Sequence, residues 1–333
     1  MAQGPCTAQA SMVVAVQGDD EDLPPSLAAG DSGEEDEPCV DLCPLFEYRL
    51  VSHAASLVEL DFGGGVRVAL RQDPSGRRIA DSSAPTCCPT ERSTRTGAVV
   101  WDAAVALAAL LAGASVSATA PALGPWRSLL ELGAGGHGLC GLAALLAGAC
   151  GAAVLTDREP LLPQLEENLA RNMAGASGPR RWAVRPLLWG QPGACAAAAS
   201  ALPGEWSDHL ETPAPGESGV DSAAGEGRRG CFDVVVAADC IYDTESAEAL
   251  AATLAEAMPP TQTSGEAFVA VDRALNREIA YARFLRRCES EGLVAELLAQ
   301  APGPHSKESV VVYRVRRYCR LGCPVTSKSQ NII

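Results

Sequence analysis

The chain has 333 residues, with 41 acidic and 26 basic side chains and a formal net charge of −15. That length fits one large domain or two small ones and allows a sizeable buried core. Residues 1–48 hold 11 of the acidic residues and no Lys or Arg, so the remainder carries 30 acidic against 26 basic groups. This nearly neutral body excludes nucleic-acid binding through a broad basic face, because duplex affinity comes largely from neutralised phosphates.

Targeting signals and metal sites are not expected. The N-terminus lacks the basic and apolar stretches of a signal peptide, and the long uncharged stretches at 103–126 and 132–156 are interrupted by Gly, Ser or Pro. The 13 cysteines are dispersed without a CxxC pair, and the four histidines are far apart. We therefore expect a protein with reduced cysteines, no metal and no membrane contact. It is expected to be a monomer in the cytoplasm, with the nucleus as the alternative.

Composition divides the chain into a central domain and less ordered segments. Residues 1–44 are rich in acidic groups, Pro, Gly and Ser, and are predicted to be a disordered tail. Residues 45–320 form the predicted domain, interrupted by a flexible insertion at about 190–230 that is rich in Ala, Gly, Pro and Glu. Residues 321–333 are a C-terminal tail.

The domain begins with an expected antiparallel hairpin, whose strands at 57–62 and 66–70 flank three glycines. After a turn-rich loop, apolar patterns alternate between helix and strand lengths, which predicts βαβ units and a parallel sheet. The strands are expected at 128–132, 153–156, 182–187, 232–237, 267–271, 293–298 and 309–315. The helices are expected at 97–112, 139–149, 160–173, 245–258 and 276–291, with a short one near 196–201.

The strongest local signal is a glycine loop, Gly-Ala-Gly-Gly-His-Gly at 133–138, between a buried strand and a helix. Glycine is needed where the backbone turns sharply and approaches a ligand without a Cβ in the way. Asp157 ends the next strand, about 20 residues further on, where a carboxylate suits the two hydroxyls of a ribose. These features predict an adenosine-type cofactor at the carboxyl ends of the strands.

The identity of that cofactor depends on Glu131, two residues before the first glycine. NAD and S-adenosylmethionine both fit a ribose acid and a glycine loop. A carboxylate at this position would repel a pyrophosphate, whereas it can orient the loop and face a positive amine and sulfonium. The sequence therefore favours S-adenosyl-L-methionine.

Five segments resemble the class I, seven-β-strand methyltransferases, and more narrowly their protein-lysine methyltransferase-like branch, methyltransferase family sixteen. They are residues 131–141, 156–158, 97–104, 187–190 and 238–242. The resemblance implies a Rossmann-like α/β fold, a seven-stranded, mostly parallel sheet of order 3-2-1-4-5-7-6 flanked by helices, with a small N-terminal hairpin extension. The glycine loop is one residue longer than the family's usual form, with His137 in the extra position.

The resemblance also implies roles for particular residues. Asp239 would hold and orient the target amine, and Tyr242 would shape its channel. The implied cofactor-binding residues are Trp101, Glu131, Gly133, Gly135, Gly136, Asp157, Trp189 and Ala238. Trp101 would cover the methionine end of the cofactor and Trp189 the adenine.

These motifs predict an S-adenosylmethionine-dependent N-methyltransferase whose substrate is a protein with an exposed lysine. Alternatives are a protein-histidine or small-molecule methyltransferase, and a cofactor-binding interaction partner without turnover. A structural alternative is that Asp239 caps the next helix while Tyr242 packs. Asn168 and Asn172, four residues apart on one helix face, are either functional or merely solvated.

Overall fold

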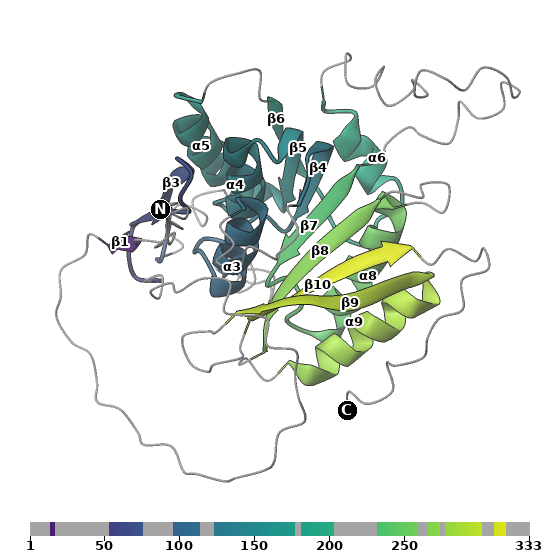
Figure 1. The fold of residues 1–333 in the computed structure, drawn as a ribbon. Coiled ribbons are helices and arrows are strands. Elements are labelled where there is room, and N and C mark those ends of the chain that lie inside the picture. Colours follow the sequence, from purple (N-terminus) through teal and green to yellow (C-terminus); the bar gives the residue numbers. More distant parts are fainter. Residues whose placement is uncertain are drawn as a thin grey trace, which may run out of the picture.

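A computed structural model describes residues 14–16, 53–75, 96–113, 123–176, 181–202, 232–258, 265–273, 277–301 and 310–317. Its main element is a seven-stranded sheet in which the strands lie in the order β6-β5-β4-β7-β8-β10-β9 (Figure 1). Numbered along the chain within this sheet, the order is 3-2-1-4-5-7-6, as the resemblance predicts. The α/β, Rossmann-like fold class is confirmed.

The first five strands of this sheet pair in parallel, and only β10 runs against its neighbours β8 and β9. Parallel strands need crossover connections, and the intervening helices provide them. The strands are β4 (Trp126–Leu132), β5 (Cys150–Asp157), β6 (Arg181–Pro186), β7 (Val234–Ala238), β8 (Glu266–Asp272), β9 (Leu293–Ala301) and β10 (Val310–Arg317).

Helices cover both faces of the sheet, with α3, α4 and α5 on one face and α6, α8 and α9 on the other (Figure 1). Alternate residues of each strand enter one of two apolar cores: Leu129 faces the first and Leu130 the second. The helices are α3 (Asp102–Leu111), α4 (Leu139–Ala147), the 3₁₀ turn η1 (Glu159–Leu161), α5 (Leu162–Met173), α6 (Ala194–Ala199), α8 (Thr244–Ala257) and α9 (Glu278–Ser290).

Among the described residues, none of these helices has the length and apolarity that a membrane span requires. The expected helix at 97–112 begins only at Asp102, because the chain before it is extended at Trp101. Of the predicted insertion, residues 191–202 are described and contain α6. Residues 203–231 and the predicted tail at 321–333 lie outside the described part.

The predicted N-terminal hairpin is present as β2 (Leu57–Asp61) and β3 (Arg67–Arg71), which pair antiparallel. A third strand, β1 (Val14–Val16), pairs antiparallel with β2. Its residues fall within the segment predicted to be a disordered tail, of which no other residue is described. The hairpin packs its buried side chains, such as Val58 and Val68, into the same core as α3 and α4.

The outer edge of β3 is closed by two asparagine side chains rather than by another strand. The side-chain amide of Asn172 pairs with both backbone groups of Ala69, accepting from N at 2.8 Å and donating to O at 2.9 Å. Asn168 pairs with Arg71 in the same way, at 2.8 and 2.9 Å. The spacings match, because four helical residues and two strand residues both advance about 6–7 Å.

Asn168 also connects the hairpin to the glycine loop. Its side-chain nitrogen donates to the carbonyl of Gly136 at 2.7 Å, and the side chain is completely buried. One asparagine on α5 therefore holds the last residue of β3 and the middle of the loop together. Asn168 and Asn172 are therefore not merely solvated, because their side chains hold the hairpin against α5.

We expect Asn168→Ala to lower the free energy of unfolding by about 2–3 kcal/mol, because it removes the hydrogen-bond partner of the Arg71 backbone N and of the Gly136 carbonyl. Urea denaturation of the full chain measures this change. Glu166→Ala, which removes an exposed side chain from the same helix, serves as the control and should change the unfolding free energy by less than about 0.5 kcal/mol. Equal effects of the two substitutions would contradict the docking role.

Candidate functional site

The candidate site lies at the carboxyl ends of the central strands. Strand β4 pairs in parallel with β5 on one side and with β7 on the other. The connections that follow the neighbouring strands β4 and β7 therefore cross to opposite faces of the sheet. Such a reversal of strand order is where open α/β sheets bind ligands. Asp157 is the last residue of β5, and the segments that follow β4, β6 and β7 carry Gly133, Trp189 and Asp239.

The glycine loop turns from β4 into α4 through three residues with left-handed backbone. Gly133, Gly135 and Gly138 have φ values of 65°, 62° and 57°. A Cβ on Gly133 would lie 2.8 Å from Cζ2 of Trp189 and 2.6 Å from Sγ of Cys240. Both the backbone geometry and the contact with the Trp189 indole therefore require glycine at position 133.

Glu131 lies beneath this loop and serves the first turn of α4. It is 3% exposed, and its carboxylate accepts from the backbone N of Cys140 at 3.3 Å and of Gly141 at 2.8 Å. These are donors that a helix N-terminus leaves without intrahelical partners. Burial raises the pKa of Glu131 to about 7, although the two backbone hydrogen bonds favour its ionised form. Glu131 thus holds the start of α4, into which the loop leads; its role toward a cofactor stays a prediction.

Asp157 joins the end of β5 to the glycine loop. One carboxylate oxygen accepts from the backbone N of Gly135 at 2.7 Å, and the other accepts from the N of Arg158 at 2.7 Å. The side chain is half-buried, and burial raises its pKa while the two backbone hydrogen bonds lower it. Because each carboxylate oxygen can accept two hydrogen bonds, each one has capacity left for a hydroxyl donor.

Two segments meet over the first glycine of the loop. The indole of Trp189, which follows β6, lies against Gly133. Cys240, which follows β7, is buried with Sγ 3.4 Å from the carbonyl of Leu132. The structure therefore brings the segment carrying Ala238 and Asp239 against the loop.

The extra residue of the loop turns into the protein. His137 is 5% exposed, and burial lowers its pKa to about 4, so the ring is neutral at pH 7. Its Nδ1 atom has no hydrogen-bond partner among the described residues. Gly136 donates to the carbonyl of Gly97 at 2.7 Å and lies against Gln164. The contact of Gly136 with a cofactor stays a prediction.

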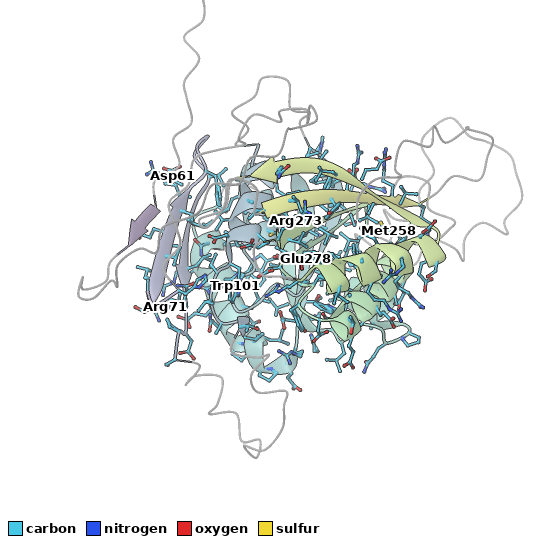
Figure 2. All side chains as sticks on the ribbon, turned by 90° about the horizontal axis from the view of Figure 1, so that it is seen from below. Asp61, Arg71, Trp101, Met258, Arg273 and Glu278 are labelled. Carbon is cyan, nitrogen blue, oxygen red and sulfur yellow. The ribbon has the colours of Figure 1, made fainter. Side chains whose placement is uncertain are left out.

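Trp101 immediately precedes α3 and is held by the N-terminal part of the domain. Its Nε1 donates to the carbonyl of Thr96 at 2.8 Å, and its ring lies 4.6 Å from the ring of His53, between centroids. In Figure 2, Trp101 lies between the hairpin, marked by Arg71, and the region of Arg273. The proposed cover over the methionine end of a cofactor is untested by these contacts.

Asp239 follows β7 and is paired with a residue that the sequence motifs do not include. Its carboxylate Oδ1 lies 2.7 Å from Nη1 of Arg277, and its side chain is only 5% exposed. Asp239 is also the one non-glycine residue with positive φ, at 53°, among those that the structure describes. Burial raises its pKa, and Asp272 raises it further, whereas the Arg277 guanidinium lowers it.

The start of α8 tests the alternative that Asp239 caps this helix while Tyr242 packs. The cap of α8 is Asp243, which accepts from the backbone N of Ser246 at 2.7 Å in a capping box. Asp239 therefore does not cap this helix. Tyr242 is 45% exposed, so it is not a core residue. Asp239 and Tyr242 both remain candidates for contact with a substrate.

Sequence reasoning missed Arg277, because it is 38 residues from Asp239 and belongs to no local motif. The signal available was its position shortly after β8, at the edge where the other site residues gather. It also missed the contact of Cys240 with the loop, since a buried cysteine has no distinctive spacing.

Fold and loop define a doubly wound α/β protein with a site for an adenosine-type ligand at the reversal of strand order. Within this class, residues 88–199 match the family model described as lysine methyltransferase. The match confirms the resemblance predicted from the motifs. It covers the glycine loop, Asp157 and Trp189 and ends before Asp239 and Tyr242.

Similar proteins include a mouse protein, protein N-lysine methyltransferase METTL21A, which is 32% identical over 151 residues. The match covers 45% of this chain, and the chain spans about half the length of that relative. Among solved structures, the putative transferase PH0793 from Pyrococcus horikoshii superposes with a TM-score of 0.39 at 13% identity, covering 79% of this chain and 73% of that one. N-methyltransferase NodS from Bradyrhizobium japonicum superposes with a TM-score of 0.35 at 14% identity, covering 64% and 93%.

The raised pKa of Glu131 predicts a pH-dependent contribution to stability. Because its pKa is about 7 in the folded protein and 4.5 ordinarily, the folded state binds the additional proton between these values. The resulting stabilisation is complete below pH 4.5 and is lost as the pH rises to 7. Relative to Glu131→Gln, the wild type should lose up to about 3 kcal/mol over this range, at about 1.4 kcal/mol per pKa unit.

Urea denaturation of both proteins at pH 5, 6, 7 and 8 tests this expectation. The lowered pKa of His137 acts in the opposite sense, but it is present in both proteins and cancels in the difference. Parallel stability profiles of the wild type and the variant would show that Glu131 titrates normally.

Proposed function

We propose that this protein is an S-adenosyl-L-methionine-dependent methyltransferase acting on a lysine side chain of a protein. The observation that carries the proposal is the 2.7 Å contact between Gly135 and Asp157, within the segment that matches the lysine methyltransferase family. The mouse relative described as a protein N-lysine methyltransferase supports the same activity and substrate class.

The residues present fit this cofactor. Asp157 is a half-buried acceptor whose oxygens each use one backbone donor, which suits the two hydroxyls of a ribose. Gly133 and Trp189 form an apolar contact beside it, where an adenine could stack. Ala238 ends β7 next to this region. Glu131 holds α4 and so fixes the backbone that would face the cofactor.

S-adenosylmethionine supplies an activated methyl group, so the main catalytic contribution of the protein would be to align the nucleophile with that methyl group. Asp239 would accept a hydrogen bond from the target amine and set its direction. Its own backbone is fixed, because its N donates to the carbonyl of Ala270 in β8 at 2.9 Å. Tyr242, exposed three residues later, would flank the alkyl part of the lysine. The amine must be uncharged when it attacks, and water can accept its proton.

We also propose that the protein works in a reducing compartment, the cytoplasm or the nucleus. The five cysteines among the described residues are all buried, and none of them forms a disulfide with another of the five, which fits such an environment. They are Cys140, Cys150, Cys195, Cys240 and Cys288.

Asp157→Ala should weaken the binding of S-adenosylmethionine by roughly tenfold or more, since hydrogen bonds to a charged acceptor contribute about 1.5–3 kcal/mol. Isothermal titration calorimetry with the full chain measures this affinity. Glu289→Ala, which removes an exposed carboxylate from α9, is the matched control and should leave the affinity unchanged. Unchanged affinity in Asp157→Ala would refute the ribose role.

Asp239→Asn should retain cofactor binding but lose methyl transfer. Incubation of a cell lysate with labelled S-adenosylmethionine and the purified protein should label a protein band. This labelling should fall roughly tenfold or more in the variant. A tenfold fall corresponds to the loss of about 1.4 kcal/mol of transition-state stabilisation. Glu289→Gln is the control and should label like the wild type.

The lysate experiment also separates the competing activities. Label in small molecules and in no protein band would contradict a protein substrate. Label on histidine, identified by peptide mass spectrometry, would contradict a lysine substrate. Equal labelling by the wild type and Asp239→Asn would remove Asp239 from the mechanism.

A further inference from the structure

Arg277 is placed to control the carboxylate of Asp239. Arg277 lies immediately before α9, and its side chain is mostly buried, with 19% exposed. Nη1 is 2.7 Å from Oδ1 of Asp239 and 3.4 Å from the carbonyl of Ile241. Arg277 thus contacts the segment after β7 both at the acid and two residues beyond it.

We propose that Arg277 is a positioning residue of the site, which engages one oxygen of Asp239 and leaves the other to receive the target amine. The inference rests on the proposed function, because it gives Asp239 an amine to hold. Oδ2 of Asp239 accepts no hydrogen bond from any residue in the described ranges, whereas Oδ1 is committed to Arg277. A carboxylate held at one oxygen has a fixed plane, so the direction of its free oxygen is set as well.

The second consequence is electrostatic. Asp239 is buried, and the titratable groups around it are Asp272 from β8, Arg277 just before α9, Tyr281 from α9, and Cys240 beside it. Burial and the negative charge of Asp272 both favour the protonated acid. Arg277 is the cation that opposes them. A protonated Asp239 would offer the amine a weaker acceptor, so the guanidinium favours the form of the acid that the proposed role requires.

The position of Tyr281 supports a built arrangement. Its hydroxyl donates to the carbonyl of Asp272 at 2.9 Å, so the first turn of α9 is joined to the end of β8. Arg277 precedes the same turn, and its neighbour Glu278 lies near Arg273 in Figure 2. Two independent contacts therefore hold the start of α9 against the strands that carry the two acids.

The first test measures the pKa of Asp239 without substrate or cofactor. Carbon-13 NMR of the full chain with labelled aspartate, assigned with Asp239→Asn, follows the titration of the carboxyl group. Arg277→Met should raise the pKa of Asp239 by at least about one unit, because the opposing cation is gone. Arg277→Lys should keep it near the wild-type value. Arg283→Met, an exposed residue of α9 that pairs with Glu248, is the matched control and should not change it.

The second test measures the pH dependence of methylation with labelled S-adenosylmethionine and lysate protein. Arg277→Met should lower the initial rate roughly tenfold, because the plane of the Asp239 carboxylate is no longer fixed and its ionised form is less favoured. This rate deficit should widen as the pH is lowered and narrow as it is raised, because a higher pH favours the ionised acid. Arg277→Lys should restore most of the rate at pH 7, and Arg283→Met should behave as the wild type.

An unchanged pKa of Asp239 in Arg277→Met would overturn the inference, as would a rate deficit that is the same at every pH, which indicates a purely structural loss. The two proposals fail differently. If the wild type labels no protein, the proposed function fails. In that case the NMR titration still decides whether Arg277 lowers the pKa of Asp239. This measurement also remains valid for a variant that is partly destabilised but still folded.

Discussion

The parallel pairing of β4 with both β5 and β7 is the constraint on which the site depends. Because all three strands point the same way, the segments that follow them must emerge at one edge of the sheet. The reversal of strand order at β4 then sends their connections to opposite faces, which leaves room between them. Gly133, Asp157 and Asp239 are far apart in sequence and meet only because of this arrangement.

The chain solves the problem of a buried carboxylate in two ways within this region. Glu131 is surrounded by backbone donors at the start of α4 and contributes to the orientation of the loop. Asp239 is paired with a guanidinium from another element. The first solution needs no countercharge and tolerates a proton near neutral pH, whereas the second places a cation beside the acid, which favours its ionised form. The first arrangement suits a structural acid, and the second suits the role proposed for Asp239.

Much of this architecture could be predicted from sequence, because its signals are local. Strand and helix lengths follow from apolar patterns, and the glycine loop with Asp157 identifies a ligand-binding edge. Even the strand order followed from the resemblance of short motifs. The contacts of Asn168 with the hairpin and of Arg277 with Asp239 could not be predicted, since they join residues 97 and 38 positions apart. Nothing in the spacing of a single asparagine or arginine indicates which distant backbone or carboxylate it will meet.

The positive φ of Asp239 restricts what this position can become. Among residues with a Cβ, Asp and Asn tolerate left-handed backbone best, and glycine adopts it without strain. Of these three residues, only Asp carries a charge. Glu would preserve the carboxylate but fits this backbone less well, and its longer side chain would displace the acid from the guanidinium. The turn after β7 therefore makes any drift away from Asp a loss of the anion as well, so that the backbone conformation and the chemistry select the same residue.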